Sequence, residues 1–353
     1  MEHPIAPARP FPSPPPAVPR AAYLPLVPDI VSRALTEAPI LAQVVRSGTV
    51  ESVHRGTVAV TSPDGRLEQA WGDPTGLIFP RSANKPIQAV GMVTAGLDLP
   101  AHQLALACAS HSGEDFHQQT ALEILHGAGL TEADLLNTPD YPVEERFREA
   151  WLRADRPKTS LAQNCSGKHA AMLATAVAGG WPTDTYLDPD HPVQQAITGT
   201  VERLGGAHVG ALAIDGCGAP LHGIPLQSLA RAFGRIAAAP TAAPESPEAR
   251  VALAMRAHPE HVGGTGRQVT ALMREVGGLV AKDGAESVYA VGLADGRGIA
   301  VKIADGHTRA KSIVLSAVLR RLGVGTPTLY AALEDAPVLG HGRPVGAIEA
   351  TLP

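Results

Sequence analysis

The chain has 353 residues, which is enough for one large domain or two, each with an ample core. Its 44% hydrophobic and 4% aromatic content is typical of an Ala-, Val-, Leu- and Gly-rich soluble protein, and no apolar run reaches the ~18–20 residues that a membrane span needs. A formal net charge of -5 argues against nucleic acid or an anionic membrane as the main partner.

The N-terminal segment differs from the rest of the chain. Ten prolines fall within the first 28 residues, so residues 1–30 are predicted to be a disordered, proline-rich tail ahead of a single folded domain at residues 31–353. The tail has no basic segment followed by a continuous apolar run, which argues against a signal peptide and favours a cytoplasmic protein. The three cysteines, at positions 108, 165 and 217, are an odd number and do not indicate a disulfide framework.

Hydrophobic periodicity and turn signals predict most of the elements. Residues 40–60 and 67–71 have the β-branched content of strands, and Ser62-Pro-Asp-Gly65 between them is a turn signal. Residues 139–158 are expected on the surface, and residues 239–248 as a Pro/Ala-rich loop. Helices are predicted from residue 84 and over 115–127, 165–178, 193–204, 226–238, 248–257 and 268–276, with a buried segment at 101–109 and a short strand at 210–214.

The C-terminal third gives the clearest architectural signal. Residues 278–281, 287–293 and 298–303 are predicted as three strands divided by Gly/Asp turns, and residues 309–322 as a long amphipathic helix. An antiparallel meander covered by helices on one face is an α+β arrangement rather than a doubly wound parallel sheet. The sequence therefore predicts an α+β fold.

The stretch Arg81-Ser-Ala-Asn-Lys-Pro86 contains the first candidate catalytic pair. Residues 75–81 have the pattern of a short strand and turn before a helix, so Ser82 and Lys85 would share one face of its first turn. A serine hydroxyl becomes nucleophilic when a neighbouring base takes its proton, and a desolvated lysine can be that base. Backbone N–H groups at the helix start could receive an oxyanion. The S-x-x-K pair therefore indicates serine nucleophile chemistry, the alternative being a chance match.

Two downstream motifs strengthen this interpretation. Ser110-His-Ser112 and Lys282-Asp-Gly284 follow in the order S-x-x-K, S-x-polar, K-x-G, which is that of penicillin-recognising serine enzymes and related glutaminases. In such a site the second serine relays protons and the strand lysine keeps the site positive, which favours a neutral first lysine. The alternative for Lys282 is a surface lysine at the end of a strand.

Two cysteine motifs raise the question of a metal. Asn164-Cys-Ser-Gly-Lys-His169 and Asp215-Gly-Cys-Gly218 place small residues around Cys165 and Cys217, so the two thiols could approach each other. Two thiolates with a nearby histidine or carboxylate suit zinc. The alternative, favoured by the lack of a C-x-x-C pair, is two buried free cysteines that pack as small hydrophobic groups.

Two further groups have both a chemical and a structural interpretation. His111, Glu114 and His117 could bind a metal, but Glu114 and its neighbour Asp115 favour a turn and a helix start instead. Arg267, which ends Gly263-Gly-Thr-Gly-Arg267, could orient a substrate carboxylate together with backbone N–H groups. The alternative for that segment is a flexible loop before a helix.

Taken together, these motifs resemble the thermolabile L-asparaginase II family, the rhizobial-type class 3 L-asparaginases. The resemblance runs from about residue 40 to residue 322 or beyond and leaves out the proline-rich tail. It is carried by six motifs in order: Arg81-Ser82-x-x-Lys85-Pro86-x-Gln88, Ser110-His-Ser-Gly-Glu114, Asn164-Cys-Ser-Gly-Lys-His-Ala170, Asp215-Gly-Cys-Gly-x-Pro220, Gly264-Thr-Gly-Arg267 and Lys282-x-Gly-Ala-Glu286.

The resemblance implies a serine β-lactamase/glutaminase-like fold, in which an antiparallel sheet is flanked by helices and accompanied by a helical subdomain. Residues 31–353 would be one catalytic asparaginase domain, working as a homodimer that hydrolyses L-asparagine to L-aspartate and ammonia. Ser82 would be the nucleophile and Lys85 its base, while Ser110 and Lys282 would form a second Ser–Lys pair. Ser112 stays open as the alternative second serine.

The resemblance also implies a substrate pocket and a metal. Arg81, His169 and Asp215 would line the pocket, and Ser112 and Arg267 are added to it as candidate substrate-binding residues. A zinc ion, modulatory rather than essential, would be held by Cys165, Lys168 and Cys217, and the lysine must lose its proton to bind.

Two other enzyme classes remain as alternatives. One keeps the fold and acts on another substrate, as a glutaminase or a β-lactam or D-peptide hydrolase. Glutamine differs from asparagine by one methylene, which is worth only about 1–3 kcal/mol in discrimination. The other is a zinc-dependent hydrolase that uses Cys165 and Cys217 and a metal-bound water. A binding protein without turnover is disfavoured by the presence of both serines and both lysines.

Overall fold

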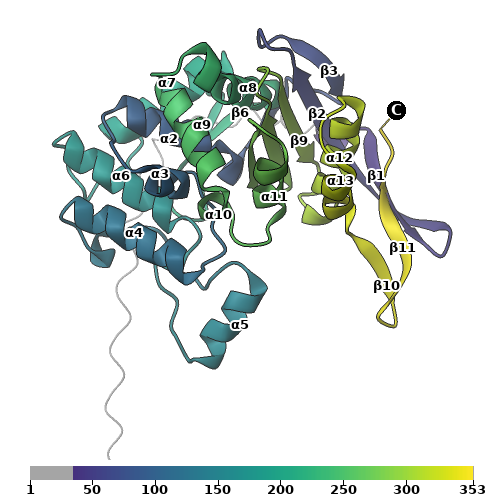
Figure 1. Ribbon diagram of the computed structural model, residues 1–353, viewed down its shortest axis with the longest axis horizontal. Coiled ribbons are helices and arrows are strands. Elements are labelled where there is room, and N and C mark those ends of the chain that lie inside the picture. Colours follow the sequence, from purple (N-terminus) through teal and green to yellow (C-terminus); the bar gives the residue numbers. More distant parts are fainter. Residues whose placement is uncertain (1–34, 353) are drawn as a thin grey trace, which may run out of the picture.

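A computed structural model describes residues 35–352 of the chain, so the predicted tail at residues 1–30 lies outside the described residues. An antiparallel sheet stands on one side of a larger group of helices (Figure 1). The sheet has the strand order β10-β11-β1-β2-β9-β8-β7, with β3 paired to β2. Its strands are β1 (Ile40–Arg46), β2 (Thr49–Thr61), β3 (Leu67–Trp71), β7 (Val280–Gly284), β8 (Val288–Gly292), β9 (Gly298–Ile303), β10 (Pro337–Gly340) and β11 (Arg343–Ala350). Every pairing in it is antiparallel, which confirms the predicted α+β class.

A second, small sheet positions the segment that leads to Ser82. Its strands are β4 (Leu77–Ile78), β5 (Ala211–Ile214) and β6 (Pro220–Pro225), in the order β4-β6-β5. β5 and β6 form a hairpin around the turn that holds Asp215 and Cys217. Because β4 pairs with β6, the segment entering the S-x-x-K helix and the second cysteine motif belong to one sheet.

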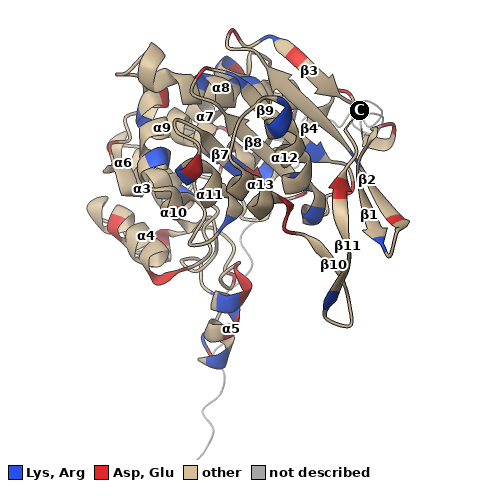
Figure 2. Ribbon diagram, turned by 45° about the vertical axis from the view of Figure 1, so that its right-hand side comes forward, with Lys and Arg blue, Asp and Glu red and all other residues tan. Residues whose placement is uncertain are grey.

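The helical part of the molecule surrounds α2 (Lys85–Thr94), which is buried from Lys85 to Val93 and packs against α7 (Pro192–Gly205). Charged residues of both signs are interspersed over the elements, as on α5 (Figure 2). The other helices of this part are α3 (Ala101–Ala107), α4 (Asp115–Gly127), α5 (Glu145–Arg153), α6 (Ser166–Ala178), α9 (Pro247–Ala257), α10 (Pro259–Val262) and α11 (Gln268–Glu275). Among the described residues, no helix is both long and apolar enough to cross a bilayer.

Helices cover both faces of the central strands. β8 and β9 are buried along their whole length, and both contact α8 (Leu226–Ala242) and α12 (Lys311–Arg321). The expectation of helices on one face is therefore wrong for these strands. Their sequences VYAVG and GIAVKI are apolar at nearly every position, so neither face can be left to water.

Glycines allow α8 to lie close to the sheet. A Cβ atom on Gly292 would collide with the carbonyl oxygen of Phe233, and one on Gly298 with that of Ala230. The helix backbone thus contacts the strand backbones directly, and its apolar face closes the core over β8 and β9.

Most predicted elements agree with the structure, but several boundaries and strands differ. The predicted loop at 239–248 is largely helical, since α8 continues to Ala242 with Pro240 in its last turn and α9 begins at Pro247. The predicted surface excursion at 139–158 contains α5, and residues 40–60 form a hairpin of two strands. β6, α10, α13 (Pro327–Glu334), β10 and β11 were not predicted. β11 alternates only weakly and owes its register to β1, a partner about 300 residues away in the chain.

Candidate active site

Ser82 lies in a short 3₁₀ turn, η2 (Arg81–Asn84), between β4 and α2. Arg81, which precedes it, has a backbone φ of 53°, a left-handed conformation that residues other than glycine rarely adopt. Such strain is held by the surroundings, and here β7 presses against the turn: a Cβ atom on Gly284 would lie 2.5 Å from the carbonyl oxygen of Pro80. Ser82 lines a cavity of about 500 Å³, and within residues 35–352 its hydroxyl has no hydrogen-bond partner. The nucleophile candidate is therefore free to meet a ligand.

Lys85 is buried one turn further along, with only 1% of its surface exposed. Its ammonium donates hydrogen bonds to the Ala109 carbonyl oxygen at 2.5 Å, to Ser110 Oγ at 3.0 Å and to Cys165 Sγ at 3.2 Å. No hydrogen bond joins it to Ser82 within the described part of the chain. All three N–H donors of this lysine therefore have acceptors.

The structure separates the two serines of the Ser110–Ser112 turn. Ser110 accepts the hydrogen bond of Lys85 and lines the same cavity as Ser82. Ser112 is fully buried, and its hydroxyl donates to Glu114 Oε1 at 2.8 Å, against Gly264. The geometry thus places Ser110, and not Ser112, beside the first Ser–Lys pair.

Lys282 lies inside β7 and not at its end, so the alternative of a surface lysine is wrong. It is fully buried, and its ammonium donates to the backbone carbonyl and to Oδ1 of Asp283 at 2.7 and 2.8 Å. Burial, together with the positive charges of Lys85 and Arg267, lowers the pKa of Lys282 to about 8. Its pKa therefore lies closer to neutrality than that of an ordinary lysine.

Arg81 and Asp215 form an ion pair next to the nucleophile, with Arg81 Nε 2.8 Å from Asp215 Oδ1. Burial would raise the pKa of Asp215, but the charges of Lys168 and Arg81 outweigh it and lower that pKa. His169 is fully buried; its Nδ1 lies 2.7 Å from the Tyr186 hydroxyl, and its Nε2 has no partner. Burial holds the pKa of His169 well below its ordinary value, so its ring is neutral. Arg81 and Asp215 therefore offer opposite charges that match the carboxylate and the ammonium of an amino acid.

The two cysteine motifs meet as predicted from their small flanking residues. Lys168 Nζ lies 3.1 Å from Cys217 Sγ, and Cys165 packs against Cys217. A hydrogen bond from the Cys165 thiol and the charge of Lys168 hold the pKa of Cys217 well below its usual range, whereas that hydrogen bond and burial raise the pKa of Cys165 to about 12. Burial would lower the pKa of Lys168, but the neighbouring thiol groups and Asp215 outweigh it and raise that pKa. One thiolate, one thiol and one ammonium are thus in contact beside Lys85.

His111, Glu114 and His117, which follow Ser110 in the chain, have a structural role. Glu114 directly precedes α4, and the rings of His111 and His117 stack with their centres 4.9 Å apart. Within residues 35–352, no three His, Cys, Asp or Glu side chains are grouped so that they could hold a metal ion. The turn and helix start predicted for this motif are confirmed.

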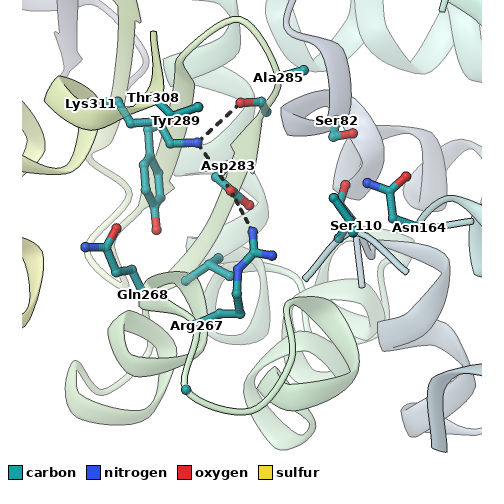
Figure 3. A pocket seen from close by; sticks show the side chains of 14 residues that line it. Ser82, Ser110, Asn164, Arg267, Gln268, Asp283, Ala285, Tyr289, Thr308 and Lys311 are labelled. Carbon is teal, nitrogen blue, oxygen red and sulfur yellow. Dashed lines mark hydrogen bonds and ion pairs between the residues drawn. The ribbon is translucent and has the colours of Figure 1, made fainter. Parts of the chain in front are cut away.

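The cavity has two walls, which Figure 3 shows with Ser82, Ser110 and Asn164 on one side and Arg267, Asp283, Tyr289 and Lys311 on the other. Asp283 is the centre of the second wall. Burial would raise its pKa, but Lys282, Lys311 and Arg267 hold the pKa of Asp283 well below its usual range. Arg267 was singled out from the sequence; Asp283, Tyr289 and Lys311 were not. The only signal for Asp283 is its place between Lys282 and Gly284, and Lys311 follows the cavity-lining Thr308 at the start of α12.

A comparison with protein-family models identifies the family of this chain. The model described as L-asparaginase II matches residues 42–350, which is most of the sequence. The chain belongs to the L-asparaginase II family. Membership makes it an amidohydrolase and confirms the resemblance found in the six motifs. The roles of single residues, zinc, the homodimer and the cytoplasmic location stay predictions.

Solved structures add distant similarities. A crystal structure of Mglu in its native form is 16% identical, with a TM-score of 0.40 over 84% of this chain and 71% of that one. A putative beta-lactamase from Bacteroides dorei is 15% identical, with a TM-score of 0.39 over 82% and 97% of the two chains. A beta-lactamase from Mycobacterium bovis is 12% identical, with a TM-score of 0.38 over 82% and 98%. These likenesses are too remote to inform on activity, and no curated protein matches the chain.

Proposed function

We propose that this L-asparaginase II family member hydrolyses the side-chain amide of L-asparagine to L-aspartate and ammonia, with Ser82 as the nucleophile. The observation that carries the proposal is the cavity that Ser82 and Ser110 both line. Lys85 Nζ lies 3.0 Å from Ser110 Oγ. The backbone N–H of Ser82 also has no acceptor within the described residues, so it is free to receive an oxyanion.

Two lysines would divide the proton transfers. Lys85 would take the Ser82 proton in its neutral form, because an ammonium has no lone pair with which to accept one. Lys282, with a pKa of about 8, gives up its proton more readily than an ordinary lysine and would complete the second pair with Ser110. That pair would return a proton to the departing ammonia, after which water cleaves the acyl-enzyme.

The Arg81–Asp215 pair would bind the amino-acid head of the substrate. The ammonium would contact Asp215 and the carboxylate Arg81, replacing the present ion pair at 2.8 Å. Since Arg81 directly precedes Ser82, this arrangement would fix the amide carbon close to the nucleophile.

The predicted zinc set has a chemically suitable donor group. Cys165, Cys217 and Lys168 bring two sulfur atoms and one amine together, which fits the ligand preference of zinc once Lys168 loses its proton. When bound, the ion would supply positive charge beside Lys85, since Cys165 Sγ lies 3.2 Å from that amine. The proposed reaction uses no metal-bound group. Removing the ion by exhaustive chelation should therefore only weaken the activity and not abolish it. Loss of all activity would favour the zinc-hydrolase alternative.

A coupled ammonia assay on L-asparagine tests the function directly. The variant Ser82→Ala should lose on the order of 10³-fold or more in kcat while its thermal unfolding stays close to that of the wild type. The same assay with L-glutamine separates an asparaginase from a glutaminase by the ratio of kcat/KM values. Wild-type ammonia release by Ser82→Ala would rule out this nucleophile.

A further inference from the structure

The cavity wall opposite Ser82 has more charge than asparagine needs. Asparagine carries one ammonium and one carboxylate, and the Arg81–Asp215 pair already matches both. That pair does not line the cavity, which extends instead toward Arg267, Asp283 and Lys311. We call the cavity residues Arg267, Asp283, Tyr289 and Lys311 the leaving-group wall (Figure 3).

The charges of this wall leave one positive charge uncompensated. Asp283 contacts Lys282 at 2.8 Å, Arg267 at 3.2 Å and Lys311 at 3.3 Å. Among the described residues, a second carboxylate, that of Glu144, lies 3.5 Å from Arg267. While Lys282 holds its proton, three cations therefore face two carboxylates, so the wall is complementary to one more anionic group.

Lys311 is the cation with donor capacity to spare. Within residues 35–352 its ammonium has two acceptors, Asp283 Oδ2 at 3.3 Å and the Gly284 carbonyl oxygen at 3.4 Å, and both contacts are longer than an ordinary charged hydrogen bond. A lysine ammonium has three donors. One N–H of Lys311 can therefore turn toward a ligand in the cavity.

A buried phenol gives a second, independent indication of a ligand. Tyr289 is 1% exposed and lines the cavity, and its hydroxyl has no hydrogen-bond partner within the described residues. An unpartnered buried hydroxyl destabilises the fold, and a polar group bound in the cavity would supply the missing hydrogen bond. The cavity volume of about 500 Å³ also lies in the range of sites for ligands larger than one amino acid.

From this wall we propose a second substrate class, which rests on the proposed function: β-aspartyl dipeptides, in which the amide nitrogen of asparagine carries a second amino acid. The aspartyl head binds Arg81 and Asp215, and the carboxylate of the second amino acid binds Lys311. Ser82 Oγ attacks the amide carbon, the C–N bond breaks, and the free amino acid leaves with the serine proton on its nitrogen. Water then hydrolyses the aspartyl ester, giving L-aspartate and regenerating Ser82.

A pair of matched substrates tests the proposal. β-Aspartylglycine and N4-ethylasparagine have the same amide and the same number of atoms along the leaving chain up to the terminal carbon, but only the first ends in a carboxylate. The wild type should release glycine with a kcat/KM on the order of 10- to 100-fold above that for ethylamine. The variant Lys311→Met should lose this preference, and Lys311→Arg should restore most of it. Lys158→Met, which removes an exposed lysine paired with Asp140, is the control and should keep the preference.

Each failure has a separate meaning. A wild type that hydrolyses asparagine but shows no preference for β-aspartylglycine overturns the leaving-group wall and leaves the proposed function standing. Equal losses of Lys311→Met on asparagine and on β-aspartylglycine also overturn it, because Lys311 would then bind the head that both substrates share. A wild type inactive on asparagine itself contradicts the proposed function. If Lys311→Met does not fold, the wild-type comparison decides alone.

Discussion

Gly284 offers a way to move the nucleophile turn without changing a functional group. A Cβ atom at this position would lie 2.5 Å from the Pro80 carbonyl oxygen and 3.1 Å from the Ala83 backbone nitrogen, the two groups that flank Arg81 and Ser82. Ordinary contact begins at 3.4 Å, so the turn must withdraw by 3.4 − 2.5 = 0.9 Å. Both obstacles are backbone atoms, and no side-chain rotation can relieve the contact.

A displacement of this size should affect catalysis more than stability. Misplacing a reacting group by about 1 Å costs on the order of 10²-fold in rate, whereas overpacking in a core costs about 1–3 kcal/mol of folding free energy. Gly284→Ala should therefore reduce kcat for asparagine about 100-fold, measured by ammonia release, and lower the urea midpoint modestly.

A glycine in open space provides the control. Gly199, inside α7, has nothing within 4 Å of its would-be Cβ atom. Gly199→Ala should keep wild-type kcat and gain about 0.5–1 kcal/mol of stability from helix propensity. If Gly284→Ala retained kcat within twofold of the wild type, β7 would not hold the Ser82 turn in place.

Two further outcomes follow from charges in the site. Because the pKa of Lys282 is about 8, the proton that this residue would supply to the departing ammonia becomes scarcer as the pH rises above that value, so kcat/KM should stay level up to about pH 8 and then fall. A Lys282→Met variant that kept the same pH profile would exclude Lys282 as the titrating group. Asp215→Asn removes the carboxylate proposed for the substrate ammonium and should raise KM for asparagine by roughly 10-fold or more with a smaller change in kcat. A fall in kcat with unchanged KM would place Asp215 outside substrate binding.

The sequence predicted this site well where function depends on short motifs. Ser82 and Lys85 are one helical turn apart, and the small residues around Cys165 and Cys217 allowed the contact that the structure shows. The turn at Glu114 and the helix start at Asp115 also follow from local residue types. Such features depend on a few neighbouring residues, so their chemistry can be read before the fold is known.

Which side chain each motif meets could not be predicted in the same way. The spacing places Lys85 near Ser82, yet its hydrogen bonds go to Ser110 and Cys165, which arrive from α3 and α6. The choice between Ser110 and Ser112 depends on Gly264, more than 150 residues further on. These contacts arise from the packing of distant segments around α2, and no local pattern encodes them.

By itself, then, the sequence determined the α+β class, the family motifs and the residue types of a serine amidohydrolase site, because hydrophobic period, turn residues and motif spacing act over a few residues. Tertiary structure alone decided that helices cover both faces of β8 and β9, that Lys282 is buried within β7, and that Asp283 and Lys311 face Ser82 across one cavity. The physical reason is that burial and charge pairing depend on which surfaces meet, and segments hundreds of residues apart in the chain meet only in the folded protein.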